Sequence, residues 1–337
     1  YINAVSKVVE NGKIYMNGNN SSYDAGGGGA GGAVYIVSPI FTGSGTIIAN
    51  GGNALTTTYS GGGGGGRIAI VRNIHDFKGT ITTSGGTGKN SGGTGTVFWG
   101  NLPNLSWHFD EGSGTVAKDA SIMGNNGTIT GATYDVLTNS ESNRFSLKFN
   151  GSNQYVSKSY SSDQELDPYT ESFAVGSWFR HSSTMAGTDT LIARYSSGGY
   201  KIYMNSSGYM CFGIDGDATW TPNDSVCTTA SLGSLADSKW HHVEAVKNGT
   251  TSISIYIDGN LINTLTTLTV TGSLSGSSPT FYAGIDSDGT SNAWDGFIDE
   301  VNVYPGNRTA AQVKGDFADR SALKSTGASL GAKTRAE

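Results

Sequence analysis

Residues 253–257 read Ile-Ser-Ile-Tyr-Ile and are followed directly by Asp258 and Gly259. Every second side chain of this run is an isoleucine, which is the alternation expected of a strand with one buried face. Asp-Gly is one of the strongest signals for a tight hairpin turn, so the chain should return antiparallel to this strand. The stretch therefore predicts a hairpin within an antiparallel sheet.

Short apolar runs separated by turn residues continue on both sides of this hairpin, with further Asn-Gly turns at 150–151 and 248–249. The runs occupy 145–149, 172–179, 200–203, 241–246, 280–283 and 297–304. Helical periodicity is nearly absent, and one helix is expected at 309–316 with Thr309 as its N-cap. Many strands joined by hairpin turns predict an antiparallel jelly-roll β-sandwich over residues 104–317. Residues 318–337 are expected to form an extended polar tail.

Glycine dominates the first hundred residues, and three segments there resemble one another: 12–18, 45–51 and 79–85. Their offsets are 33 and 34 residues, and strand-like runs rich in Ile and Val recur in step with them. A fixed period with short β-runs predicts a glycine-rich β-solenoid of stacked strands over residues 1–103. Glycine should supply corners with positive φ and allow close approach of backbones. A flexible glycine-rich linker is the alternative. The predicted fold class is all-β.

Charged residues make up only 14% of the 337-residue chain, and the net charge is -6. Because no Lys/Arg cluster occurs, nucleic-acid binding is not expected. No apolar run approaches the ~20 residues of a membrane span. The first residue is Tyr, from which we expect a processed piece of a longer precursor. Cys211 and Cys227 could bridge two strand ends in an oxidising compartment, or remain as buried thiols. An extracellular, cell-surface or surface-appendage location is expected.

Several motifs of the second region follow one another in a characteristic order. They read Leu-Ser-Trp-His-Phe-Asp-Glu-Gly-Ser-Gly at 105–114, Phe-Asn-Gly-Ser-Asn-Gln-Tyr-Val at 149–156, Ser-Phe-Ala-Val-Gly-Ser-Trp-Phe at 172–179, Trp-His-His-Val at 240–243 and Gly-Phe-Ile-Asp-Glu-Val-Asn-Val-Tyr at 296–304. In this order, residues 105–317 resemble the laminin-G-like/concanavalin A-like jelly-roll domains of secreted proteins. The glycine-rich region bears a weaker likeness to the repeats of large surface proteins. Asn150 and Gln154 stand where the family usually has acids.

The resemblance implies one structural Ca²⁺ between the first and last strands. By this likeness Asp299 would supply a carboxylate, with Asp110 near it and Gly151 offering a carbonyl. A hard cation that takes several oxygen ligands suits such loop-held positions. The alternative is that Asp299 caps a turn or pairs with an Arg. Asp286 and Asp288 lie in a glycine-containing loop that could form a second site at the rim of the domain, although such loops are commonly turns.

Glycan binding requires exposed aromatic side chains beside polar groups. Trp220 and Trp294 lie in loops among polar residues, so we expect them to contact a ligand together with Asp286 and Asp288. Loop aromatics can also close the ends of a sandwich. Trp178 and Trp240 fall within apolar patterns, which favours packing in the core.

Catalysis finds little support in the sequence. Asp299 and Glu300 are adjacent, so in a regular strand their side chains would face opposite ways and could not flank one glycosidic bond. A Gly-x-Ser-x-Gly sequence occurs only at 327–331, in the predicted polar tail and not after a predicted strand, so it does not indicate a nucleophile elbow, and no His-Glu-x-x-His motif occurs. We therefore expect a protein that is not an enzyme. Its sandwich would bind a glycan or an extracellular surface protein. The alternative is a self-assembling subunit of a filament or surface layer, and a glycan hydrolase is a third, weaker hypothesis.

Overall fold

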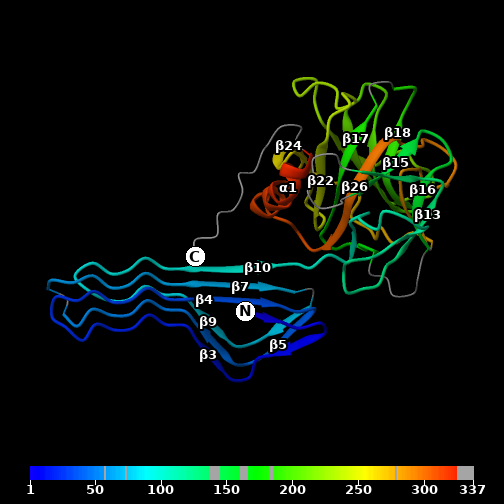
Figure 1. Ribbon diagram of the computed structural model, residues 1–337. Coiled ribbons are helices and arrows are strands. Elements are labelled where there is room, and N and C mark those ends of the chain that lie inside the picture. Colours follow the sequence, from blue (N-terminus) through cyan, green and yellow to red (C-terminus); the bar gives the residue numbers. More distant parts are fainter. Residues whose placement is uncertain are drawn as a thin grey trace. The chain divides into compact units, whose positions relative to one another are not determined.

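The computed structural model describes residues 1–56, 58–72, 74–136, 145–159, 166–182, 185–277 and 279–324 (Figure 1). The chain divides into two compact units, Tyr1–Leu102 and Pro103–Glu337. Apart from α1, the regular elements of the described residues in both units are strands, which confirms the predicted all-β class with a stacked-strand region followed by an antiparallel jelly roll. Among the described residues, no helix is both long and apolar enough to cross a membrane.

The first unit stacks short parallel strands into three narrow sheets, in the orders β1-β4-β7-β10, β2-β5-β8 and β3-β6-β9. Their bounds are β1 Ile2–Asn3, β2 Lys7–Val9, β3 Lys13–Tyr15, β4 Ala33–Val37, β5 Ile40–Gly43, β6 Thr46–Ile48, β7 Arg67–Val71, β8 Ile74–Phe77, β9 Thr80–Thr82 and β10 Thr96–Gly100. Lys13 pairs with Thr46, and Thr46 pairs with Thr80, so the register follows the spacing seen in the sequence. Each apolar residue therefore stacks on its counterpart, and Ile36, Ile47 and Ile70 are buried between the sheets.

The glycines of the first unit allow the backbones of neighbouring segments to approach one another closely. A Cβ on Gly63 would overlap the carbonyl oxygen of Gly29, and one on Gly86 would overlap that of Gly52. Neighbouring segments bond directly through their backbones, as in Gly52 N–H to Gly29 O at 2.8 Å and Gly63 N–H to Gly52 O at 2.9 Å. The expectation of positive-φ corners was wrong for most of the region. Among the described glycines of this unit, Gly43 alone has a positive φ.

The second unit is a sandwich of two eight-stranded sheets. One has the order β14-β15-β26-β17-β22-β23-β24, with β11 also paired to β26, and the other has the order β12-β13-β16-β25-β18-β19-β20-β21. The bounds are β11 Leu105–Trp107, β12 Val116–Ala117, β13 Gly127–Thr130, β14 Thr133–Val136, β15 Phe145–Asn150, β16 Tyr155–Lys158, β17 Phe173–His181, β18 Asp189–Tyr195, β19 Gly199–Met204, β20 Met210–Asp215, β21 Asp224–Cys227, β22 His241–Asn248, β23 Ser252–Ile257, β24 Asn260–Leu265, β25 Phe281–Ala283 and β26 Asp295–Pro305. The pairings between these strands are antiparallel.

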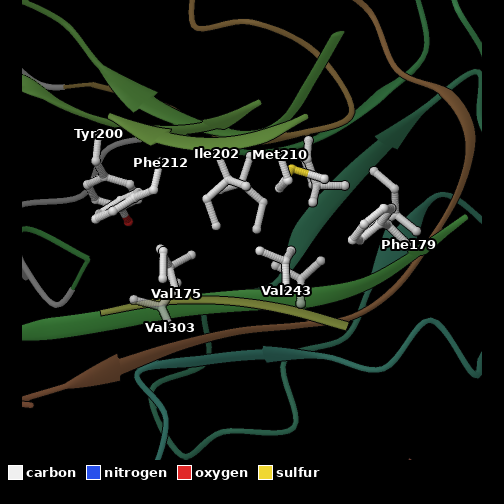
Figure 2. Packing of buried hydrophobic residues seen from close by; sticks show 14 of the residues in the cluster. Val175, Phe179, Tyr200, Ile202, Met210, Phe212, Val243 and Val303 are labelled. Atoms are coloured by element: carbon white, nitrogen blue, oxygen red, sulfur yellow. The ribbon is translucent and has the colours of Figure 1, made fainter. Parts of the chain in front are cut away.

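The inward side chains of the two sheets meet in one apolar core (Figure 2). Val175, Phe179 and Val243 come from one sheet and face Ile202 and Phe212 of the other. The hairpin predicted from residues 253–259 is present as β23 and β24. Asp258 and Gly259 have φ values of 50° and 75°, the positive values that a type I′ turn requires.

The helix α1, Ala310–Lys324, begins where the sequence predicts. The Thr309 hydroxyl accepts the Gln312 N–H at 3.3 Å, and the Gln312 side chain accepts the Thr309 N–H at 2.8 Å, which is a capping box. The helix continues into the segment expected to be an extended tail, so that expectation was wrong as far as Lys324. Residues 325–337 of the predicted tail lie outside the described residues.

Candidate functional site

Five aromatic side chains gather on the outer surface of the sheet that contains β18, β19 and β20. Side chains alternate along a strand, so Tyr200 and Ile202 of β19 enter the core while Tyr203 points outward. We call this surface the aromatic face and define it by Tyr155, Tyr195, Tyr203, Trp220 and Tyr282. Each of these side chains is half-buried, so each keeps part of its ring accessible.

Trp220 is held by the loop between β20 and β21. A Cβ on Gly213 of β20 would lie 3.2 Å from the Trp220 ring, so the indole rests against this bare stretch of backbone. The ring meets Tyr195 edge to face at a centroid distance of 5.0 Å and Tyr203 at 6.5 Å. Sheet and neighbouring tyrosines thus fix the orientation of Trp220, as a stacking platform requires.

Lys201 joins two of the residues predicted from the sequence. Its side chain is only 4% exposed, and its Nζ forms an ion pair with Asp286. The same Nζ lies 4.2 Å from the centre of the Trp220 ring and 5.2 Å from that of Tyr195. Trp220 and Asp286, both predicted from the sequence, therefore contact the same cation, Lys201, which the sequence analysis did not predict. The alternation Lys201-Ile202-Tyr203 could have indicated it, because it places Lys201 on the same side of the strand as Tyr203.

Asp288 lies farther along the same loop and is exposed. Its carboxylate accepts N–H groups of Thr290 and Ser291 at 2.8 and 2.9 Å. Burial by itself would raise the pKa of Asp288, but these hydrogen bonds outweigh it and lower the pKa. The carboxylate is therefore ionised at neutral pH, and it acts on the neighbouring Tyr282 of the aromatic face.

A disulfide between Cys211 and Cys227 joins β20 to β21. The disulfide ties the two strands together at the end of their pairing that lies farthest from the loop carrying Trp220. Asp215 holds the same loop from within, because its carboxylate accepts the N–H groups of Asp217 and Thr221 at 3.0 and 3.1 Å. Polar contacts thus anchor the loop, and the disulfide joins the two strands that flank it.

Trp294 does not lie on the aromatic face. Its side chain is fully buried, with its ring edge to face against Phe179 at 5.7 Å and His181 at 4.7 Å. The expectation that Trp294 contacts a ligand was wrong. Its polar neighbours in the sequence suggested an exposed loop, but the ring is buried in the apolar core. Trp178 is buried as well, but it lies on the outer side of its sheet, stacked on Phe317 of α1 at 5.5 Å.

Of the three residues proposed for Ca²⁺, Gly151 lies away from Asp299 along β26, whereas the charges of Asp110 and Asp299 both act on His108. Asn150, next to Gly151, pairs with Asp295, and Asp295 lies four positions before Asp299 on β26. At about 3.3 Å per residue this places Gly151 roughly 13 Å from Asp299 along the strand. The Asp110 carboxylate accepts the Phe145 N–H at 3.1 Å. Within the described ranges, no group of three or more His, Cys, Asp or Glu side chains could hold a metal ion. Calcium binding stays a prediction.

Asp299 and Glu300 share one side of β26, contrary to the expectation from strand alternation. The register between β17 and β26 shifts at this point, and Glu300 has a φ of 53°. This bulge adds one residue, so Glu300 turns outward and contacts His108 at 2.5 Å while Val301 returns to the core. The hydrogen bond that the Glu300 carboxylate accepts outweighs burial and raises the pKa of His108, with the charge of Asp299 contributing.

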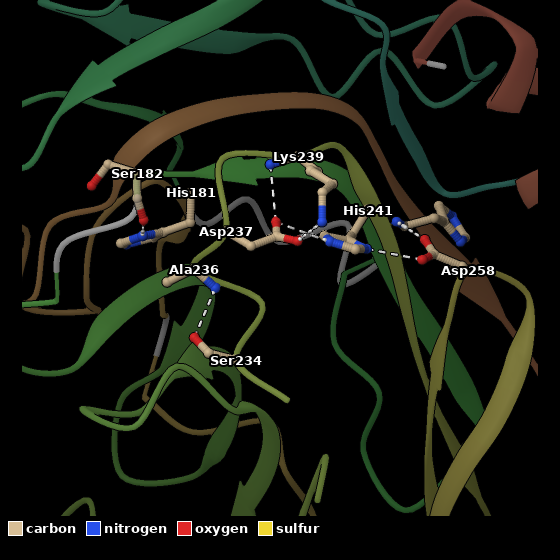
Figure 3. A network of polar contacts seen from close by, with 9 residues as sticks. His181, Ser182, Ser234, Ala236, Asp237, Lys239, His241 and Asp258 are labelled. Carbon is tan, nitrogen blue, oxygen red and sulfur yellow. Dashed lines mark hydrogen bonds and ion pairs between the residues drawn. The ribbon is translucent and has the colours of Figure 1, made fainter. Parts of the chain in front are cut away.

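A second polar network surrounds His241, at the start of β22 (Figure 3). Its Nδ1 lies 2.9 Å from the Asp258 carboxylate and its Nε2 lies 3.3 Å from that of Asp237, which also binds Lys239 at 2.8 Å. Burial would lower the pKa of His241, but the two carboxylates raise it. Asp258 belongs to the β23–β24 turn, so the network fastens that hairpin to the preceding loop.

Comparison with known proteins finds a family model that matches just under half of the chain, together with solved structures of similar fold. Residues 150–314 match the concanavalin A-like lectin/glucanases superfamily. No curated protein matches the chain. Two solved structures are similar in fold. They are the binding domain of Paraclostridial Mosquitocidal Protein 1, with 15% identity and a TM-score of 0.52, and the Botulinum Neurotoxin serotype G binding domain, with 16% identity and a TM-score of 0.51. Each alignment covers 65% of this chain. The chain spans about half the length of the two matched structures, 52% of the first and 51% of the second.

Proposed function

We propose that this concanavalin A-like domain belongs to a non-catalytic extracellular surface protein and binds a glycan through the aromatic face. The observation that carries the proposal is Trp220, which is half-exposed, oriented by Gly213 and flanked by Tyr195. A pyranose ring stacks on such an aromatic plane with its C–H groups, and fixed polar groups beside the plane accept its hydroxyl protons. Asp288, which is exposed near Tyr282, offers such acceptor oxygens at this face, while Asp286 holds Lys201 next to the indole.

Two further features support a binding role outside the cell. Asp299 and Glu300 are 2% and 5% exposed, and Glu300 contacts His108. Glu300 lines a small pocket with His108 but Asp299 does not, so a sugar there would not meet these two carboxylates as a pair. The Cys211–Cys227 disulfide fits an oxidising compartment. The binding domains of similar fold named above are consistent with a ligand-binding role.

A glycan array tests the proposal. The full chain should bind one or more glycans, and Trp220→Ala should lower the binding about five- to thirtyfold, because loss of a stacking platform costs on the order of 1–2 kcal/mol. Trp240→Ala is the matched control. Trp240 is also half-buried, but it lies beside Phe297 on the other sheet, so its removal should leave binding unchanged. Binding to no glycan, or equal losses in both variants, would refute the assignment.

A second candidate function, self-assembly, is favoured by the stacked-strand unit. Among the described residues, β10 pairs with β7 alone, and its Val97 and Phe98 are 40% and 43% exposed. Parallel strands with an open edge can pair with a further copy. Sedimentation over a wide concentration range tests this, since a monomer at every concentration would exclude it.

A further inference from the structure

The charged groups that flank the aromatic face at the surface are carboxylates. Three cations occur on the strands that carry this face: Lys158, Arg194 and Lys201. Lys158 and Arg194 alternate with outward residues and therefore occupy inward positions. Lys201 faces outward but is buried and paired with Asp286. Arg194 is paired with Asp167 and Lys201 with Asp286, so neither offers a free positive charge, and the half-exposed Lys158 stands at an inward position at the end of its strand.

The two loops beside the platforms carry carboxylates and no cation. Asp215 ends β20 and Asp217 lies in the loop that holds Trp220, where the Tyr195 hydroxyl donates to the Asp217 carbonyl at 2.8 Å. Burial together with these two carboxylates raises the pKa of Tyr195 to about 12. On the other side of the face, Asp286 and Asp288 belong to the loop beside Tyr282. Asp217 and Asp288 are exposed, one at each side of the aromatic face.

We propose that the aromatic face selects glycans made of uncharged or amine-bearing sugars and discriminates against sialylated or sulfated ones. The proposal rests on the proposed function and deepens it by naming the ligand class. A carboxylate or sulfate on a bound sugar would meet Asp217 or Asp288 without an accessible cation to compensate. An amine would meet the same carboxylates favourably, while a neutral ring would depend on stacking over Trp220 alone.

The size of this discrimination follows from Coulomb's law. Two exposed carboxylates at roughly 8 Å from an added negative charge, in water, weaken binding about fivefold, or about 1 kcal/mol. Salt should reduce the difference. Between about 0.01 M and about 1 M ionic strength the screening length falls from about 30 Å to about 3 Å, which is shorter than the roughly 8 Å between the carboxylates and the added charge.

The test uses an array on which each glycan core is printed in neutral, sialylated, sulfated and de-N-acetylated form. Wild-type protein should bind neutral and de-N-acetylated members about fivefold more strongly than the acidic members of the same core at low salt, and the ratio should shrink at high salt. In the double variant Asp217→Asn/Asp288→Asn, the ratio of neutral to acidic binding should approach one. Trp240→Ala should keep the wild-type ratio.

The outcomes separate the two proposals. Binding that is equal or stronger for acidic members overturns the selectivity while leaving the glycan-binding function in place, provided that Trp220→Ala still lowers that binding. A ratio that persists in the double variant also overturns it, because the carboxylates would not be its cause. No binding to any member overturns the proposed function itself.

Discussion

Replacing Gly63 by Ala tests whether the stacked-strand unit depends on backbone approach. The new methyl group would overlap the carbonyl oxygen of Gly29 and lie 2.9 Å from that of Gly28. Real Cβ atoms essentially never come closer than 3.0 Å to such atoms, and here the obstacle is backbone, so two neighbouring segments must move apart. Gly93→Ala is the matched control, since nothing lies within 4 Å of its added Cβ.

The expected cost follows from the hydrogen bonds that hold these segments. Gly63 donates to Gly52 at 2.9 Å, and Gly52 donates to Gly29 at 2.8 Å. Losing both, with their groups left poorly satisfied, should cost about 2–4 kcal/mol. Gly93→Ala should be neutral or slightly stabilising, by about 0.4–1 kcal/mol, because Ala restricts the unfolded chain.

Hydrogen exchange on the full chain measures this locally. Amides of the glycine-rich segments should exchange on the order of a hundredfold faster in Gly63→Ala than in wild type, which corresponds to about 3 kcal/mol. The amides of the sandwich should be unaffected. Equal protection in Gly63→Ala and Gly93→Ala would refute the close-packed arrangement of the glycine segments.

Two further predictions concern the sandwich. Burial raises the pKa of Glu244, which pairs with Arg308 at 2.9 Å, from 4.5 to about 7. The folded state therefore binds this proton more tightly. The resulting stabilisation is complete below pH 4.5 and is lost as the pH rises through 7, by at most about 3 kcal/mol. In urea titrations from pH 5 to 8, Glu244→Gln should lose less stability with rising pH than the wild type does. The same pH dependence in both proteins would contradict this. Replacing Cys211 and Cys227 by Ser should cost about 3 kcal/mol, since 16 positions separate them. Wild type under reducing conditions is the control, and an unshifted urea midpoint would exclude a stabilising disulfide.

Much of the fold could be predicted because the deciding signals are local. Asp258-Gly259 determines its turn through backbone conformations that few residues adopt, and the alternation at 253–257 determines which side chains enter the core. The glycine-rich unit was harder to interpret in detail. Its spacing gave the register of Lys13, Thr46 and Thr80, but spacing does not reveal whether a glycine is needed for its φ or for contact with a neighbouring backbone.

The site could be predicted only in part, because exposure is decided by distant residues. Trp220 and Trp294 have similar polar neighbours in the sequence, yet Trp220 rests on Gly213 at the surface and Trp294 meets Phe179 in the core. The role of Lys201 could not be predicted, because a lysine within a strand usually reaches solvent. Glu300 turned outward through a bulge, and a bulge changes the alternation on which the prediction depended.

The most direct test of the aromatic face is the indole N–H spectrum of the ¹⁵N-labelled protein, which contains six tryptophans. The strongest-binding glycan of the array would be titrated into the full chain, with the Trp220 signal assigned from its absence in Trp220→Ala. We predict that the Trp220 resonance shifts in proportion to occupancy, while those of the buried Trp107 and Trp294 stay in place. Saturation of binding with an unmoved Trp220 signal would contradict the assignment of the ligand to this face.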